Sequence, residues 1–107
     1  MKQCELCKFN NPKGTATAVI IKDGRLLFLR RVEDPFRGML DLPGGYMNHG
    51  ELPEEALKRE VKEELGVDCS ASFLGVFPGT AEWRGKNFSI LSHAYFVEPK
   101  KDIKVNK

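Results

Sequence analysis

The sequence predicts an α+β domain in which a mixed or antiparallel β-sheet packs on one helix. Its 107 residues suffice for one domain with a single hydrophobic core. Four segments are rich in the apolar, aromatic and β-branched residues that are typical of strands. A polar, glutamate-rich segment between the second and the third of them has the pattern of a helix. The predicted order is therefore strand, strand, loop, helix, strand, strand.

The first half of the sheet is predicted to be a hairpin. Residues 15–22 are rich in β-branched side chains, and residues 25–31 return as a second strand. Asp23-Gly24 between them is a two-residue turn, because both positions tolerate a positive φ. The unbroken apolar run of residues 26–29 predicts that this strand is buried on both faces.

The predicted helix follows a loop. Prolines and glycines punctuate residues 32–50, which predicts a loop over most of this stretch. Pro53 suits the first turn of a helix, where its missing N–H costs nothing, and the helix is expected to continue to Leu65. Gly66 is placed to end the helix in the left-handed conformation.

The second half of the sheet is predicted from two further segments. Residues 71–79 have the composition of a strand that ends at a Pro-Gly pair, and residues 79–87 that of a loop. Residues 88–97 form the longest predicted strand. The lysine-rich tail after residue 97 is expected to be solvated.

The composition argues against several classes of protein. Hydrophobic residues make up 41% and charged residues 30%, which is ordinary for a soluble protein, and no apolar run is long enough to span a membrane. The N-terminus lacks the apolar stretch of a secretory signal, and three cysteines do not suggest a disulfide framework, so a cytoplasmic location is expected. The formal net charge of +2 comes without a concentrated basic patch, so nucleic acid is not expected as a partner.

Six glutamates crowd the stretch between Gly45 and Val67. On a helical projection, the apolar stripe that can face the sheet consists of Leu57, Val61 and Leu65. One continuous arc bordering this stripe consists of Glu60, Glu63 and Glu64. Negative charges at the edge of a core repel one another strongly, because the dielectric constant there is low.

A hard divalent cation would relieve this repulsion. Mg²⁺ prefers oxygen ligands in octahedral geometry, and carboxylates commonly supply them. Arg59 lies four residues before Glu63 and can hold that carboxylate in place. Gly44-Gly45, upstream of the helix, permits a close approach between backbone and a metal or phosphate. The alternative is a solvated acidic face without a ligand.

The same stretch resembles the signature of the Nudix hydrolases. That signature is Gly, five residues, Glu, seven residues, Arg-Glu, an aliphatic residue, any residue, Glu-Glu, any residue, Gly and an aliphatic residue. Its positions are filled here by Gly45, Glu51, Arg59, Glu60, Val61, Glu63, Glu64, Gly66 and Val67. The preceding LDLPGG is similar to the usual lead-in of the family, with Leu40 where a tryptophan is common. The resemblance implies a Nudix-type fold for residues 14–107.

The resemblance also implies an activity, the hydrolysis of a nucleoside diphosphate linked to another moiety, with Mg²⁺ or Mn²⁺ as cofactor. The implied metal ligands are the carbonyl of Gly44 and the carboxylates of Glu60, Glu63 and Glu64. Glu64 would also deprotonate or orient the attacking water, Arg59 would orient the glutamates, and Glu51 would be an outer acid. ADP-ribose, NADH and dinucleotides are the favoured substrates, followed by oxidised nucleoside triphosphates. The alternative is a catalytically weak module that senses a nucleotide or binds nucleic acid or protein.

Residues 1–13 form a leader that contains two cysteines. Cys4 and Cys7 have the spacing of a zinc knuckle, and the leader resembles half of the zinc ribbon in the Nudix subgroup of NADH and ADP-ribose pyrophosphatases. A structural Zn²⁺ site normally needs four ligands, so this pair is incomplete within one chain. Either a second chain completes it or the two thiols are unconnected.

Four residues outside the signature are candidates for substrate contacts. Arg30 and Arg31 can reach phosphates, although arginines at strand ends are usually surface residues. Trp83 can stack on a nucleobase with help from Arg84. A tryptophan that caps the core is the alternative.

The end of the sequence departs from the family pattern. Nudix domains commonly continue past the last strand into another helix, whereas this sequence stops at Lys107. Three interpretations stay open: a truncated chain, a natural minimal form, and a partner subunit, as in a homodimer, that covers the exposed face of the sheet.

Overall fold

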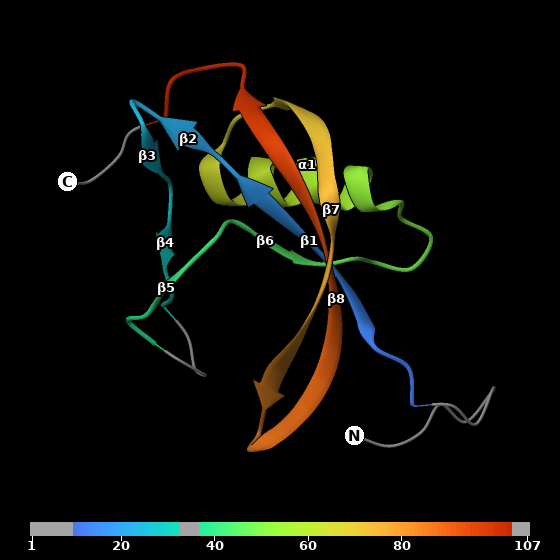
Figure 1. Cartoon of the computed structure of the whole chain (residues 1–107). Coiled ribbons are helices and arrows are strands. Elements are labelled where there is room, and N and C mark those ends of the chain that lie inside the picture. The colour runs from blue at the N-terminus through green and yellow to red at the C-terminus, as the bar shows by residue number, and fades with distance from the viewer. Residues whose placement is uncertain (1–9, 33–36, 104–107) are drawn as a thin grey trace.

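The computed structural model describes residues 10–32 and 37–103, with Trp83 described through its backbone alone. Four strands form the main sheet in the order β6-β1-β8-β7 (Figure 1). They are β1 (Lys13–Val19), β6 (Gly44–Tyr46), β7 (Cys69–Trp83) and β8 (Lys86–Pro99). The sheet is mixed, because β1 runs parallel to β8 while the β1–β6 and β7–β8 pairs are antiparallel. One helix, α1 (Pro53–Leu65), packs on one face of this sheet, which confirms the α+β class.

The hydrophobic core lies between α1 and the sheet. Ala16 and Ala18 on β1 are fully buried, and their small side chains let the helix approach closely. Leu57 and Val61 are fully buried above them, and Leu65 is partly buried at the end of the same stripe. Burial stabilises the fold by about 1.5–3 kcal/mol for each large aliphatic side chain. The predicted apolar stripe is therefore confirmed.

Both ends of α1 lie where the sequence predicts them. Pro53 occupies the first turn, and the Glu55 carboxylate accepts a hydrogen bond of 2.8 Å from the backbone N–H of Leu52. Gly66 adopts a left-handed conformation with φ of 73° and donates its N–H to the carbonyl of Lys62 at 2.9 Å. Glycine adopts this conformation without the steric cost that a Cβ brings, which explains why the helix ends there.

The predicted loop over residues 79–87 is wrong. β7 continues through this stretch to Trp83, and β8 begins at Lys86, so the two strands form one long hairpin. The turn between them is only Arg84-Gly85, with φ of 50° and 75°, as in the tight turns that suit the twist of paired strands. Pro78 is tolerated within β7 because this strand lies at the edge of the sheet.

The predicted first hairpin is confirmed at its turn but not in its strands. Asp23 and Gly24 have φ of 53° and 74°, as a two-residue turn requires. The chain around it forms short two-stranded ribbons outside the main sheet, namely β2 (Ile21–Lys22) with β3 (Arg25–Leu26) and β4 (Leu29–Arg30) with β5 (Leu40–Asp41). Leu26 and Phe28 are 41% and 43% exposed, so the predicted burial on both faces is wrong.

The stretch from residue 32 to residue 50 is less irregular than predicted, because it contains β5 and β6. In the described part of the chain, α1 is the one helix, and none is long and apolar enough to cross a membrane.

Candidate active site

Arg59 is the centre of a network of carboxylates. Its Nε and Nη2 donate to the two oxygens of Glu51 at 2.7 and 3.0 Å, which is a bidentate pair. Its Nη1 donates to Glu60 Oε1 at 2.8 Å and lies 3.3 Å from Glu63 Oε2. The contact predicted between Arg59 and Glu63 is present, but the contacts with Glu51 and Glu60 are shorter.

This network shifts the pKa values of its members. The hydrogen bonds from Arg59, and after them one from the backbone N–H of Asn48, lower the pKa of Glu51. The carboxylates of Glu51 and Glu60 in turn raise the pKa of Arg59, which keeps this guanidinium charged. Arg59 also donates through Nη2 to the backbone carbonyl of Tyr46 at 3.0 Å, so the network joins α1 to β6.

Gly45 provides the space for the Glu60 carboxylate. A Cβ atom at this position would lie 2.7 Å from both Cδ and Oε1 of Glu60, closer than such atoms approach in proteins. The side chain of Glu60 is itself largely buried, with 16% of its surface exposed. The carboxylate therefore lies directly against the backbone of β6.

Gly44 binds the last glutamate of the arc. Its N–H donates to Glu64 Oε1 at 2.8 Å. Gly44 has a φ of 146°, and a Cβ here would overlap the backbone carbonyl of Ala16 on the neighbouring strand. The conformation is accessible to glycine at little cost, so two consecutive glycines are required for two different reasons.

Glu64 carries negative charge that its surroundings do not balance. Desolvation raises its pKa, and the negative charges of Glu60, Asp41 and Glu63 raise it further, while the hydrogen bond from Gly44 acts in the opposite direction. A site of this kind favours the arrival of a positive charge.

The donor set of this region fits a hard divalent cation. Glu60, Glu63 and Glu64 offer carboxylate oxygens, and Mg²⁺ is bound in proteins by such oxygens together with water and phosphate. Among the described residues, no three His, Cys, Asp or Glu side chains are close enough to share a metal as they stand. The Glu63 side chain is 57% exposed and free of the core, so it can turn toward its neighbours when a cation binds.

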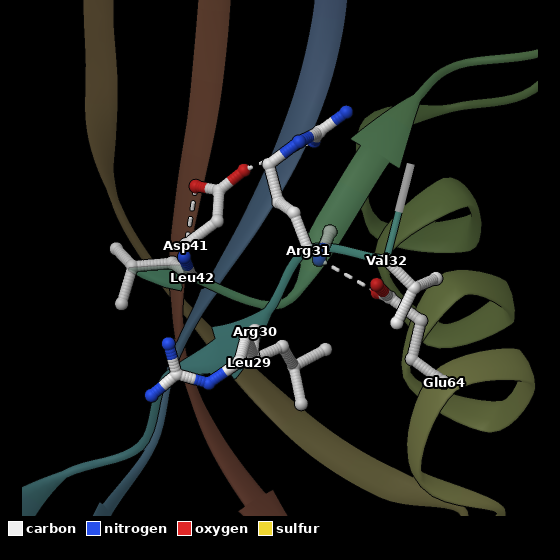
Figure 2. A pocket seen from close by; sticks show the side chains of 8 residues that line it. Leu29, Arg30, Arg31, Val32, Asp41, Leu42 and Glu64 are labelled. Carbon is white, nitrogen blue, oxygen red and sulfur yellow. Dashed lines mark hydrogen bonds and ion pairs between the residues drawn. The ribbon is translucent and has the colours of Figure 1, made fainter. Parts of the chain in front are cut away.

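A pocket of about 240 Å³ lies beside Glu64 (Figure 2). Two arginines and two acids line it, namely Arg30, Arg31, Asp41 and Glu64, together with Leu29, Val32, Leu42 and Gly44. Arg31 lies 3.6 Å from Asp41, and Arg30 donates to the carbonyl of Gly38 at 2.6 Å. The structure thus brings both predicted arginines to the same pocket as Glu64.

A larger cleft of about 670 Å³ shares four lining residues with this pocket, namely Arg31, Asp41, Leu42 and Gly44. Its floor includes Thr15 and Thr17 of β1 and Ile90 and Ser92 of β8. A hydrogen bond of 2.6 Å joins the hydroxyls of Thr17 and Ser92. Tyr46, Thr80 and Glu82 also line the cleft, whereas none of its described lining residues comes from α1.

The other candidates from the sequence lie elsewhere. Arg84 is exposed in the turn of the β7–β8 hairpin, whose tip projects away from α1, and it lines neither cavity (Figure 1). The backbone of Trp83 ends β7 beside it. Cys4 and Cys7 lie outside the described residues.

Two residues of the site are missed by the motif. Asp41 adds negative charge near Glu64 and lines both cavities. Tyr46 lines the larger cleft, and its carbonyl accepts a hydrogen bond from Arg59. Their positions next to Gly44-Gly45 are the one signal in the sequence that could have indicated them.

The sequence and the fold are similar to those of known proteins. The NUDIX domain model matches residues 12–107. The chain is 38% identical over 81 residues to an ADP-ribose pyrophosphatase of Methanocaldococcus jannaschii, an alignment that covers 72% of this chain and 48% of that protein. It is 44% identical over 45 residues to an 8-oxo-dGTP diphosphatase of Haemophilus influenzae, which covers 41% of this chain and 33% of that protein. The chain therefore spans about half the length, or less, of these curated relatives.

Solved structures extend the similarity to most of the fold. A MutT NUDIX hydrolase from Burkholderia pseudomallei superposes with a TM-score of 0.75 at 30% identity, covering 89% of this chain and 74% of that one. The NUDIX domain of Shewanella oneidensis NrtR in complex with ADP ribose superposes with a TM-score of 0.66 at 24% identity, over 82% of this chain and 60% of that one, and supports the fold alone. By its fold, its glutamate helix and this match over residues 12–107, the chain belongs to the NUDIX domain family.

Proposed function

We propose that this chain hydrolyses the pyrophosphate bond of a nucleoside diphosphate linked to another moiety, with Mg²⁺ or Mn²⁺ as cofactor. The observation that carries the proposal is the position of Glu64. Its carboxylate is held by the N–H of Gly44, it is surrounded by the charges of three further acids, and it opens onto a pocket that two arginines line. Acids for a cation and arginines for phosphates thus meet in one place.

Each residue has a role in this proposal. Arg30 and Arg31 attract the phosphates to the pocket of about 240 Å³. Glu60, Glu63 and Glu64, with the carbonyl of Gly44, would hold the cation. A bound divalent cation neutralises the pyrophosphate and makes a water molecule more acidic. Gly44 fixes Oε1 of Glu64, so Oε2 is the atom that accepts the proton of the attacking water.

Arg59 acts on this reaction through the glutamates. Its bonds to Glu51 and Tyr46 hold the guanidinium in place, and its bonds to Glu60 and Glu63 then orient two of the carboxylates that face the cation. Removal of this arginine would leave the acids mutually repelling and poorly oriented, so it serves as a positioning residue.

We propose ADP-ribose or a similar dinucleotide as the first substrate to test and 8-oxo-dGTP as the second. The relative named ADP-ribose pyrophosphatase aligns with 72% of this chain, and the relative named 8-oxo-dGTP diphosphatase aligns with 41%. The larger cleft of about 670 Å³ is of the size that proteins use for small molecules, so it can receive the nucleoside.

Release of phosphorylated products tests the proposal. The purified chain would be assayed with ADP-ribose, NADH, diadenosine polyphosphates and 8-oxo-dGTP, in Mg²⁺ and in EDTA. We expect turnover that requires the metal and falls by at least about 100-fold in Glu64→Gln, because a positioned general base typically contributes 10²–10⁴-fold. Glu54→Gln is the matched control, since this glutamate lies on the same helix and forms an exposed ion pair of 3.3 Å with Lys58.

Two results would contradict hydrolysis by this chain, and a third would contradict the role of Glu64. If the folded chain turns over none of these substrates, it is not such a hydrolase. If it binds ADP-ribose without turning it over, it is a nucleotide-binding module, the alternative that the sequence left open. Equal losses in Glu64→Gln and Glu54→Gln would remove the assigned role of Glu64.

A further inference from the structure

We propose that the nucleobase of the substrate stacks on Tyr46, and that this residue selects nucleotides over simpler phosphates. The inference deepens the proposed function and rests on it. It concerns one side chain that neither the signature nor the candidate residues of the sequence include.

Tyr46 belongs to the wall of the larger cleft. Tyr46 lines this cleft and is 47% exposed, so part of this residue is open to a ligand. Phe88 of β8 is that neighbour, with ring centroids 6.4 Å apart and planes inclined by 30°. Phe88 is absent from the described lining of the cleft, so Tyr46 is the member of this aromatic pair that a ligand in the cleft would meet. A base bound there would extend an existing stack of two rings.

The charges of the two cavities assign the base and the phosphates to different places. Two arginines and two acids line the pocket beside Glu64, which suits anionic phosphates that arrive with a cation. The larger cleft has one arginine, Arg31, against two acids, Asp41 and Glu82, while its remaining lining is neutral. A neutral base is therefore favoured in the cleft, and a phosphate is not.

The backbone of Tyr46 is tied to the glutamate network. Its carbonyl accepts the hydrogen bond of 3.0 Å from Arg59, and Tyr46 pairs with Thr15 of β1 across the sheet. Gly44, which binds Glu64, is only two residues away on the same strand. A base stacked on this ring thus lies at a fixed distance from the carboxylates, and stacking there would place the phosphates for reaction as well as bind the nucleotide.

Binding of matched phosphates tests the inference without any turnover. AMP and ribose 5-phosphate share the sugar and the phosphate and differ by the base, and neither contains a phosphoanhydride bond. Dissociation constants would be measured by calorimetry in Mg²⁺ for AMP, GMP, CMP, UMP and ribose 5-phosphate. We expect Tyr46→Leu to weaken the best nucleotide by ~5- to 150-fold and to leave ribose 5-phosphate unchanged. Tyr46→Phe keeps the ring and is expected to bind like the wild type.

Phe73→Leu is the control for loss of an exposed aromatic ring, because Phe73 is 61% exposed and packs against Tyr95 rather than the cleft. Phe73→Leu should change neither the affinity for the nucleotide nor the affinity for ribose 5-phosphate. The wild-type protein offers a second readout, since it contains only two tyrosines and Tyr95 is buried. In NMR spectra, the ring resonances of Tyr46 should shift with the nucleotide and not with ribose 5-phosphate.

The inference is overturned if no nucleotide binds the wild type more tightly than ribose 5-phosphate does. It is also overturned if Tyr46→Leu weakens both ligands equally, or if the Tyr46 resonances do not respond to the nucleotide. These results are independent of turnover, so hydrolysis could still be observed while stacking on Tyr46 is refuted.

Discussion

The two glycines of β6 allow the site and the fold to be perturbed separately. In Gly45→Ala the new methyl group would lie 2.7 Å from Cδ and Oε1 of Glu60, the outer end of a flexible side chain. Ordinary contact between such atoms begins near 3.4 Å, so the carboxylate must move by several tenths of an ångström. We expect Glu60 to give way, and its bond of 2.8 Å to Arg59 to be lost.

The magnitude follows from the bond that is lost. A hydrogen bond between charged groups contributes about 1.5–3 kcal/mol, and both of these side chains are more than two thirds buried. If this free energy is lost from the stabilisation of the transition state, kcat/KM for the best substrate should decrease by about 10- to 150-fold. The Mg²⁺ concentration for half-maximal rate should also rise. The temperature of unfolding should fall by no more than the loss of this one hydrogen bond explains.

Gly44→Ala is the contrasting variant. Its Cβ would overlap the backbone carbonyl of Ala16, which cannot turn aside, and its φ of 146° is strained for alanine. We expect a large fall in the temperature of unfolding, measured by circular dichroism. The reasoning is refuted if Gly45→Ala destabilises the fold as much as Gly44→Ala does, or if Gly45→Ala retains the wild-type kcat/KM and Mg²⁺ dependence.

Three further outcomes are expected from the same structure. In Glu51→Gln the stability at pH 7 should fall: Arg59 holds the pKa of Glu51 below its ordinary value of 4.5, so the carboxylate stabilises the fold above that value. Because this stabilisation is lost as the pH falls through the folded-state pKa, urea midpoints of the variant and the wild type should converge in acid. Leu57→Ala removes a fully buried side chain and should cost about 2–5 kcal/mol in urea unfolding. Gly66→Ala forces a Cβ into a left-handed conformation and should cost about 1–2 kcal/mol in the same assay.

The helix and its turns could be predicted because their signals are local. Proline at the first turn, apolar spacing along the helix and glycine after it all lie within 14 residues, Pro53–Gly66, and all three agree with the structure. The β7–β8 hairpin was predicted only in part. Its distal half contains Pro78, Gly79 and polar residues, which are typical of a loop, and the turn at Arg84-Gly85 lacks the usual Asn-Gly or Asp-Gly pair. Pairing with the opposite strand over the whole length decides the structure there.

In the site too, contacts between residues close in the sequence could be predicted, and contacts between distant segments could not. Arg59 and Glu63 lie one helical turn apart, so their contact follows from the spacing. The bidentate bond of Arg59 to Glu51 and its bond to the Tyr46 carbonyl depend on how the chain between residues 46 and 59 turns back. The proximity of Asp41 to Glu64 depends on the pairing of β4 with β5, which a single sequence does not reveal.

The absence of α1 residues from the described lining of the larger cleft has a consequence for how such a protein can diverge. Apart from Gly44, Arg30 and Arg31, the residues proposed to act in the reaction lie within the 23 residues from Gly45 to Val67, whereas the β7–β8 part of the cleft wall is supplied by residues 80–92. We therefore expect mutations in the hairpin to alter the substrate preference without moving the glutamates that are proposed to hold the cation. Exchange of this hairpin between relatives is thus a direct way to change the substrate selectivity while the residues of α1 stay the same.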